Sequence, residues 1–250
     1  MLERIDHDGL LELRLARPPV NALDPDLIVA LAEAVRTAPE EGARAVILSG
    51  RPGLFSAGLD VPAFLALDRA AVSDAWRAFF ELCSRLAHSD VPVAAALTGH
   101  APAGGCVLAL FTEYRVLAAG KSKMGLNEVA VGLHMPWVIH EAARFVAGSR
   151  NAQRISTTGK LWSAEEALAL GLVDELAAEE DVLERALDWA REQLALPPIA
   201  ARWARDVARG PLWAALDARE EFDPHDDLVD MWFSDETQAA LRALVASLGK

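Results

Sequence analysis

The sequence predicts an α/β protein with a core of mostly parallel strands and a helical C-terminal region. Three short runs rich in apolar residues, "ARAVILSG", "VPVAAAL" and "EYRVLAA", are typical of buried strands and alternate with helical patterns. From about residue 136 the pattern is almost wholly helical, apart from a short strand expected at "LVDEL". A chain of 250 residues can form one large domain, or one domain with a C-terminal extension.

The N-terminal quarter supplies the first strand and helix of this pattern. Leucine alternates with charged residues over 11–15, which predicts a half-buried strand. Asp24 is placed to cap the helix that follows it. The expected apolar face of that helix is Leu27, Leu31, Ala34 and Val35. A loop is then expected at 51–60 and a long helix over about 69–88.

Composition excludes several classes of partner. The formal net charge is -13 and the isoelectric point is near 4.9, whereas nucleic acids and anionic membranes need a basic face. An anionic ligand is still compatible with this charge, because a local pocket can oppose the global sign. The charged N-terminal stretch, the absence of a long apolar run and the presence of only two cysteines predict a cytoplasmic protein.

The helical tail is rich in tryptophan. Five of the seven tryptophans lie beyond residue 160. Such a tail is more typical of a core or of a subunit contact than of a ligand site, so we expect an oligomer.

Two glycine-containing turns follow predicted buried strands, where α/β sheets commonly form a ligand crevice. They are "FSAGLD" at 55–60 and "GHAPAGGC" at 99–106. Their small residues leave backbone N–H groups unshielded, and two such groups converging on one point would form an oxyanion hole. Neither turn matches a dinucleotide or P-loop motif. Each turn taken alone has an alternative, purely structural interpretation.

With the later segment "GLNEVAVG", the turns "RPGLFSAGLD" and "GHAPAGGC" resemble the crotonase, or enoyl-CoA hydratase/isomerase, superfamily. The similarity extends from "RPPVNAL" to the helical tail. It implies a spiral core of repeated ββα units, expected over residues 1–190, and a helical trimerisation region over 191–250. It also implies homotrimers or hexamers, an acyl-CoA thioester substrate that itself carries the CoA, and no separate cofactor or metal.

The resemblance also implies roles for individual residues. The thioester oxygen would accept hydrogen bonds from the N–H groups of Ala57 and Gly104, and the loop would hold CoA through its backbone. The loop residues concerned are Ala57, Gly58, Leu59 and Asp60. Asp60 has an alternative role as a helix N-cap. Asn127 would position the substrate or Glu128, with a turn role as the alternative.

One position distinguishes activities within the superfamily. Hydratases of this family use two glutamates, whereas this chain has Val107 at the first position and Glu128 at the second. One carboxylate can move a proton from C2 to C4, which is all that a double-bond shift requires besides stabilisation of the enolate. The "PAGGC" turn paired with the "GLNE" segment resembles the mitochondrial type of Δ3,Δ2-enoyl-CoA isomerase. The apolar residues Leu126, Val129 and Val131 are expected to raise the pKa of Glu128 by desolvation.

Other functions stay open at this point. The alternatives are a weak hydratase, a thioesterase or a decarboxylase acting on acyl-CoA, and a noncatalytic acyl-CoA binding protein. His134 lies six residues beyond Glu128 and could reach the acyl pocket, or could be a plain hydrogen-bonded residue. His100 is expected to be structural, Cys106 is not expected to be a nucleophile, and the histidines show no metal-ligand spacing.

Overall fold

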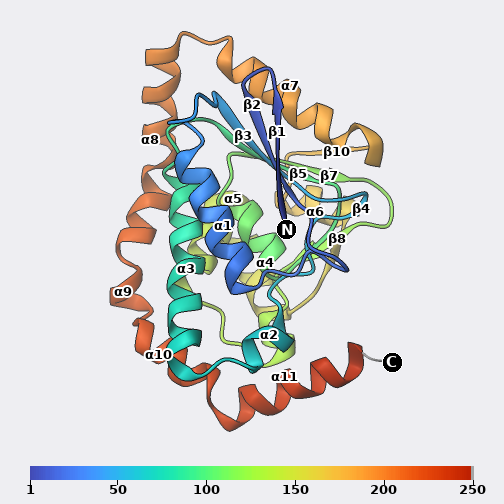
Figure 1. Cartoon of the computed structure of the whole chain (residues 1–250), viewed down its shortest axis with the longest axis vertical. Helices are drawn as coiled ribbons and strands as arrows, with labels where there is room; N and C mark the ends of the chain where they lie inside the picture. Colours follow the sequence, from blue (N-terminus) through green and yellow to red (C-terminus); the bar gives the residue numbers. More distant parts are fainter. Residues whose placement is uncertain (249–250) are drawn as a thin grey trace.

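The structure is a computed structural model that describes residues 1–248, and it is built on two sheets (Figure 1). The six strands of the main sheet lie in the order β1 (Leu2–His7), β2 (Leu10–Leu15), β3 (Ala45–Ser49), β5 (Val93–Leu97), β7 (Tyr114–Ala118) and β10 (Glu175–Ala177). All neighbours in this sheet are parallel except β1 and β2. The second sheet has the order β4 (Gly53–Leu54), β6 (Gly99–Pro102), β8 (Lys123–Gly125) and β9 (Trp162–Ser163).

Helices surround both sheets. The first six are α1 (Pro25–Thr37), α2 (Val61–Leu65), α3 (Arg69–Ala87), α4 (Gly104–Leu110), α5 (Trp137–Thr158) and α6 (Ala164–Leu170). The C-terminal five are α7 (Val182–Leu194), α8 (Pro198–Asp217), α9 (Arg219–Phe222), α10 (His225–Trp232) and α11 (Asp235–Leu248). Two short 3-10 helices are η1 (Glu128–Val131) and η2 (Glu179–Asp181).

The chain repeats one unit, which confirms the expected ββα spiral. In each repeat the first strand joins the main sheet, the second joins the smaller sheet, and helical structure follows. The repeats begin at β3, β5 and β7, and their second strands are β4, β6 and β8. Because both sets of strands are parallel neighbours, equivalent turns of successive repeats stack beside one another. This stacking brings residues 55–60 and 102–106 together.

The main sheet is buried on both faces. Alternate residues of a strand point to opposite faces, so Ile47 packs under α7 while Leu48 faces the large core beneath α1, α3 and α4. Figure 1 shows α7 lying along one side of the sheet and α8 running beside α3. Near-continuous apolar strands are what a sheet with two covered faces requires.

Most expected elements are confirmed. The strand at 11–15 corresponds to β2, although it is buried on both faces and not half-buried as expected, since Glu12 is 0% exposed. Asp24 caps α1 through its Oδ1 on the Leu27 N–H (2.9 Å), and α3 matches the expected long helix. The strand expected at "LVDEL" is displaced, because β10 begins only at Glu175. Helix α7 spans the boundary expected after residue 190. Within residues 1–248 no helix combines the length and hydropathy needed to cross a membrane.

Candidate active site

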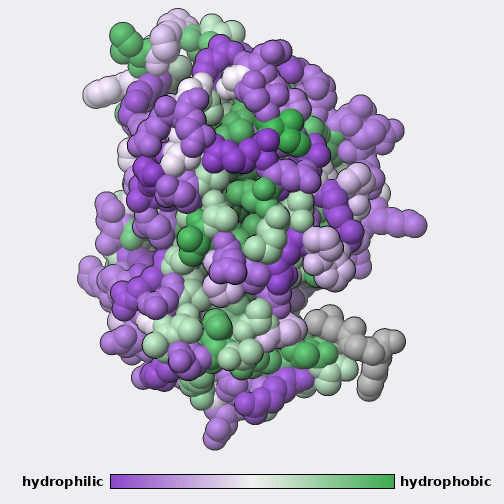
Figure 2. Space-filling view, in the orientation of Figure 1, coloured by the Kyte–Doolittle hydropathy of each residue, from purple (hydrophilic) through white to green (hydrophobic). Residues whose placement is uncertain are grey.

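A cavity of about 540 Å³ connects the two glycine turns with η1 and the C-terminal helices. Its walls include Ala57, Leu59 and Asp60 from one turn, Gly104 from the other, and Asn127 and Glu128. The rest of the lining is predominantly apolar and includes Val107, Ile139, Leu228, Met231 and Trp232. Figure 2 shows hydrophobic side chains over the region of α2 and α11, which flank this cavity. Six of the seven site residues named from the sequence therefore line one space, and Gly58 lies beside it.

The two turns touch backbone to backbone. A Cβ on Gly58, whose φ is +91°, would stand 2.8 Å from the Cβ of Ala103 and 3.2 Å from the Gly104 nitrogen. A Cβ on Gly105 would stand 2.9 Å from the carbonyl oxygen of Ser56. Contacts this short leave no room for a side chain, so glycine is required at both positions. Ala103 itself adopts φ +46° and ψ -123°, a strained conformation for a residue with a side chain.

The free N–H groups at this contact differ from those expected. The Ala57 N–H donates to the carbonyl oxygen of Val20 (3.0 Å), so it does not face the cavity as an open donor. The Leu59 nitrogen instead lies 3.3 Å from the point where a Cβ on Gly104 would stand. Within the described chain neither the Leu59 nor the Gly104 N–H donates a hydrogen bond. The sequence predicted Leu59 only as a residue of the CoA-binding loop, and not as a free N–H donor, because the carbonyl group that occupies the Ala57 N–H belongs to Val20 in another loop.

Arg17 holds the loop that carries Leu59. Its Nε lies 2.8 Å from Asp24 Oδ2, and a terminal nitrogen lies 2.8 Å from Asp60 Oδ2. The other oxygens of these carboxylates cap helices, since Asp24 Oδ1 accepts from Leu27 and Asp60 Oδ1 accepts from the Ala63 N–H (3.0 Å). The N-cap alternative for Asp60 is therefore confirmed. One guanidinium thus connects the first turns of α1 and α2 at the cavity wall.

Glu128 is a buried carboxyl group with an incomplete set of partners. It begins η1, it is 8% exposed, and within residues 1–248 its Oε2 has no hydrogen-bond partner. Burial raises the pKa of Glu128 to about 7, because the charged form loses its hydration without gaining a cation. Of the neighbours expected to desolvate it, Leu126 is buried and Val131 lines the cavity, whereas Val129 points to solvent at 42% exposed.

Val107 faces the same cavity as Glu128 and is buried. Its side chain offers neither a proton nor a hydrogen bond. Asp60 is the other carboxylate among the described lining residues, and it is engaged by Arg17 and by the helix N-terminus. Glu128 is therefore the carboxyl group in this cavity with an unpaired oxygen.

Of the remaining expected residues, Asn127 and His134 line the cavity and His100 does not. Asn127 lines the cavity beside Glu128, and its buried Oδ1 lacks a partner within residues 1–248. His134 also lines the cavity, at a solvent-exposed position. His100 is exposed, and its Nδ1 accepts from the Lys123 N–H (3.2 Å), as a structural role requires.

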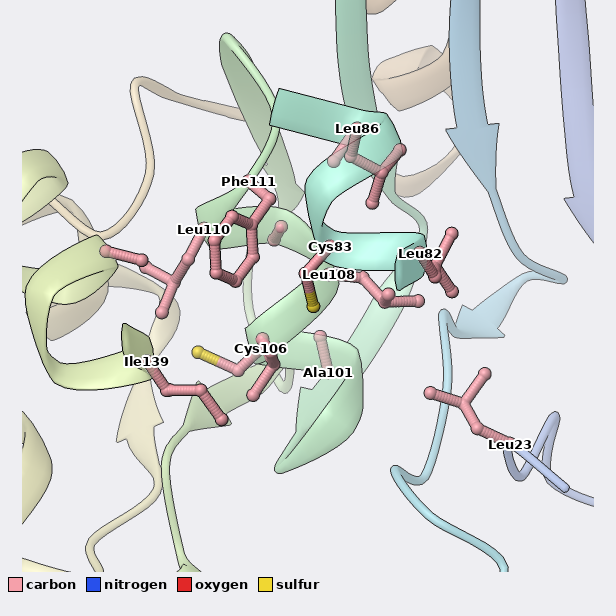
Figure 3. Close-up of a cluster of buried hydrophobic side chains, with 14 of the residues drawn as sticks. Leu23, Leu82, Cys83, Leu86, Ala101, Cys106, Leu108, Leu110, Phe111 and Ile139 are labelled. Atoms are coloured by element: carbon pink, nitrogen blue, oxygen red, sulfur yellow. The ribbon is translucent and has the colours of Figure 1, made fainter. Parts of the chain in front are cut away.

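Cys106 lies in the core and not in the cavity. Figure 3 shows its side chain beside Leu110 and Ile139, and it is fully buried. Burial raises the pKa of the Cys106 thiol well above its ordinary value, so it is not a reactive thiolate. Within residues 1–248 no group of three or more His, Cys, Asp or Glu side chains is arranged to hold a metal ion.

The aromatic C-terminal tail contributes a part of the site that sequence reasoning missed. Trp232 of α10 lines the cavity together with Trp76 of α3, with ring centroids 6.1 Å apart. Trp232 is both core and cavity wall, whereas Trp203 of the same tail is exposed. Helical periodicity shows that a residue lies on the apolar face of its helix, but it does not show which cavity that face closes.

The raised pKa of Glu128 predicts a pH-dependent stability cost. Between its ordinary pKa of 4.5 and about 7 the folded protein keeps a proton that the unfolded chain releases, so stability falls as pH rises through this range. Glu128→Gln removes the ionisable group, and we expect it to raise the free energy of unfolding at pH 8 by up to about 3 kcal/mol. At pH 4.5 the variant should match the parent protein.

Urea denaturation at both pH values measures this difference. Glu166→Gln is the matched control, because Lys160 lowers the pKa of the exposed Glu166 and no gain is expected at pH 8. An equal effect of Glu128→Gln at pH 4.5 and pH 8 would contradict a desolvated carboxyl group.

Arg17 predicts a second effect on stability. Arg17→Met leaves two partly buried carboxylates unpaired, and we expect the free energy of unfolding to fall by about 2 kcal/mol. Arg36→Met is the control, since Arg36 of α1 also contacts two carboxylates but on the exposed face of the helix. Guanidinium denaturation of both variants tests this, and equal losses would show that Arg17 is an ordinary surface ion pair.

Comparisons with known proteins agree with this geometry. Human mitochondrial enoyl-CoA delta isomerase 1 is 31% identical over 243 residues, which cover 96% of this chain and 80% of that protein. A probable enoyl-CoA hydratase of Mycobacterium avium is 37% identical over 190 residues, covering 74% of this chain and 72% of that protein. The crystal structure of human mitochondrial Δ3,Δ2-enoyl-CoA isomerase superposes with a TM-score of 0.92 at 29% identity, covering 99% of this chain and 98% of that chain.

The family model described as enoyl-CoA hydratase/isomerase matches residues 6–237, which is nearly the whole described chain. The ββα repeats, the paired glycine turns and the cavity they share with Glu128 are consistent with that match. The protein therefore belongs to the enoyl-CoA hydratase/isomerase family, within the crotonase superfamily.

Proposed function

We propose that the protein is an acyl-CoA isomerase that converts 3-enoyl-CoA to 2-trans-enoyl-CoA, with Glu128 as both base and acid. One observation carries the proposal. Within residues 1–248, a carboxyl group with a pKa of about 7 and an unpaired oxygen shares an apolar cavity with two free backbone N–H groups, and Val107 supplies no second acid there. The likeness to isomerases of known structure supports the same activity.

The proposed reaction needs two proton transfers by one group. The Glu128 carboxylate takes a proton from C2, and the C–H electron pair moves into a dienolate whose negative charge lies on the thioester oxygen. The protonated Glu128 then returns the proton to C4, and the electrons re-form the carbonyl. A pKa near neutrality suits both transfers, because neither the protonated nor the ionised form is strongly favoured at pH 7.

The N–H groups of Leu59 and Gly104 are proposed as the oxyanion donors, in place of the pair Ala57 and Gly104. Both are free in the described chain, and the contact of Gly58 with Ala103 holds them at one wall of the cavity. Each such donor typically stabilises the developing charge by about 3 kcal/mol. Gly58 and Asp60 then support the conformation of the CoA-binding loop, and the Ala57 N–H bonds this loop to the Val20 carbonyl. Asn127 positions the substrate or Glu128.

Glu128→Gln tests the activity. We expect turnover of a 3-enoyl-CoA to fall by about 10² to 10⁴-fold, since the amide cannot exchange a proton, while the affinity for the acyl-CoA persists. In the parent protein kcat/KM should fall tenfold per pH unit below about 7, as Glu128 becomes protonated. Glu166→Gln serves as the control for a surface glutamate.

The products decide between this reaction and its alternatives. The parent protein should convert 3-enoyl-CoA and leave 2-enoyl-CoA unhydrated. Release of hydroxyacyl-CoA would favour a hydratase, which the 37% identical relative makes the second candidate. Free CoA thiol would indicate a thioesterase, and loss of CO₂ from a carboxyacyl-CoA a decarboxylase. Binding without turnover of any acyl-CoA in the panel would leave a binding protein.

The proposed functional form is a homotrimer, or a hexamer built from two trimers, assembled through the helical C-terminal region. Ile199, Trp203 and Val207 lie four residues apart along α8 and are 88%, 73% and 65% exposed. A stripe of this kind on one helix face is unfavourable in water and is typical of a subunit contact. A cytoplasmic location stays a prediction.

Light scattering tests the assembly. We expect a particle three or six times 26.9 kDa in mass, and Trp203→Glu should reduce it to the single-chain mass. Trp189→Glu is not a suitable comparison, because Trp189 packs on Tyr114 with ring centroids 5.2 Å apart. Lys121→Glu is the better control, since it changes an exposed charge on a residue outside α8. A parent protein of 26.9 kDa would contradict the proposal.

A further inference from the structure

The C-terminal helix α11 packs directly on the segment that carries Glu128. Gly132 ends η1 in the left-handed conformation, with φ +73°, and a Cβ placed on it would stand 2.5 Å from the Cβ of Ala240. The N–H groups of Gly132 and Leu133 both donate to the carbonyl oxygen of Glu128. Because these hydrogen bonds close the turn, whatever fixes Gly132 also constrains the backbone of Glu128, four residues earlier in the chain.

The Thr237 side chain of α11 hydrogen-bonds to this turn. The Thr237 hydroxyl donates to the carbonyl oxygen of Gly132 (2.8 Å), and Thr237 is 1% exposed. Thr237 also lines the cavity, as does Leu244, which lies about two turns further along the same face of α11. Removing the donor from a buried backbone carbonyl destabilises the folded protein. The bond from Thr237 therefore favours one defined position of the turn.

Helix α11 also contacts α2, the helix that begins at Asp60 beside the proposed oxyanion donor Leu59. In Figure 1, α11 crosses the end of the molecule next to α2. One helix of the same chain thus spans the two halves of the site, with η1 on one side and the Leu59 loop on the other. Helix α11 thus fixes η1 and α2 relative to each other, although both lie far from α11 in sequence.

We propose that Thr237 is a positioning residue, which through Gly132 holds the Glu128 carboxyl group in reach of the substrate carbons. The proposal rests on the isomerase function proposed above. Thr237 itself takes no part in proton transfer. Its contribution is geometric, and small displacements of a reacting group cost large factors in rate.

Substitution of Thr237 separates this role from a general effect on folding. Thr237→Val keeps the shape and removes the hydroxyl, and we expect kcat with 3-enoyl-CoA to fall by about 10-fold or more while KM changes by less than about 3-fold. Thr237→Ser keeps the donor and should retain kcat within about 3-fold. Thr157→Val is the matched control, because Thr157 also donates to a backbone carbonyl, but on an exposed helix face.

Amide hydrogen exchange gives a readout that does not depend on activity. Thr237→Val should speed exchange in residues 126–134, and Thr157→Val should not. Unchanged kcat and unchanged exchange in Thr237→Val would overturn the proposal, as would equal losses in the valine and serine variants. If the parent protein fails to isomerise 3-enoyl-CoA, the proposed function fails, and unchanged exchange at 126–134 then separately refutes the Thr237 contact.

A glycine pair tests the packing side of the same contact. Gly132→Ala introduces both a strained φ and a clash with Ala240, whereas Gly171→Ala introduces the same strain with no atom nearer than 3.7 Å. We expect Gly132→Ala to lower kcat by at least 10-fold more than Gly171→Ala does. Ala240→Gly in the same chain should restore part of that difference, and full additivity of the two changes would contradict a direct contact.

Discussion

The close contact between the turns at 55–60 and 102–106, which requires glycine at positions 58 and 105, is the constraint on which the site depends. Backbone atoms of the two turns approach so closely that a Cβ at Gly58 or Gly105 would overlap its neighbour. This approach places the free amides of Leu59 and Gly104 at one wall of the cavity. It has a conformational cost at Ala103, whose φ is positive, and the Ala103 N–H donates to the Gly125 carbonyl (2.9 Å). The parallel strands β4, β6 and β8 of successive repeats support both turns.

Two buried glutamates show how the surroundings decide what a carboxyl group can do. Burial acts to raise the pKa of Glu12, but hydrogen bonds from Ser49, His7 and Arg14 outweigh it and lower that pKa. Glu12 is thus a fixed anion within the sheet. Glu128 experiences the same desolvation without those donors, so its pKa rises to about 7. Of these two carboxyl groups, only Glu128 can both bind and release a proton near neutral pH.

Local patterns predicted the elements, and long-range contacts decided the details of the site. The apolar strands and the Asp24 and Asp60 caps follow from neighbours in sequence, and the structure contains each of them. The pKa of Glu128 is raised as expected, but only one of its expected neighbours, Leu126, is fully buried, and the C-terminal helices complete the cavity around the carboxyl group. The free amide at Leu59 was not predictable, because it depends on which N–H the Val20 carbonyl accepts from across the loop. The positions of Trp232 and Thr237 in the cavity wall were not predictable for the same reason. Periodicity identified their helices but not the cavity that those helices close.

Among the C-terminal helices, α10 and α11 close the cavity, and α8 carries the surface proposed for assembly. The buried side of α10 and α11 supplies Trp232, Thr237 and Leu244 to the cavity, so removal of these helices would open it to water. Water would restore hydration to the Glu128 carboxylate and return its pKa toward the ordinary value of 4.5, which would weaken it as a base. The outward face of α8 carries the exposed stripe proposed for assembly. A subunit contact on α8 would stabilise the region that excludes water from the site, and so would couple assembly to the proton affinity of Glu128.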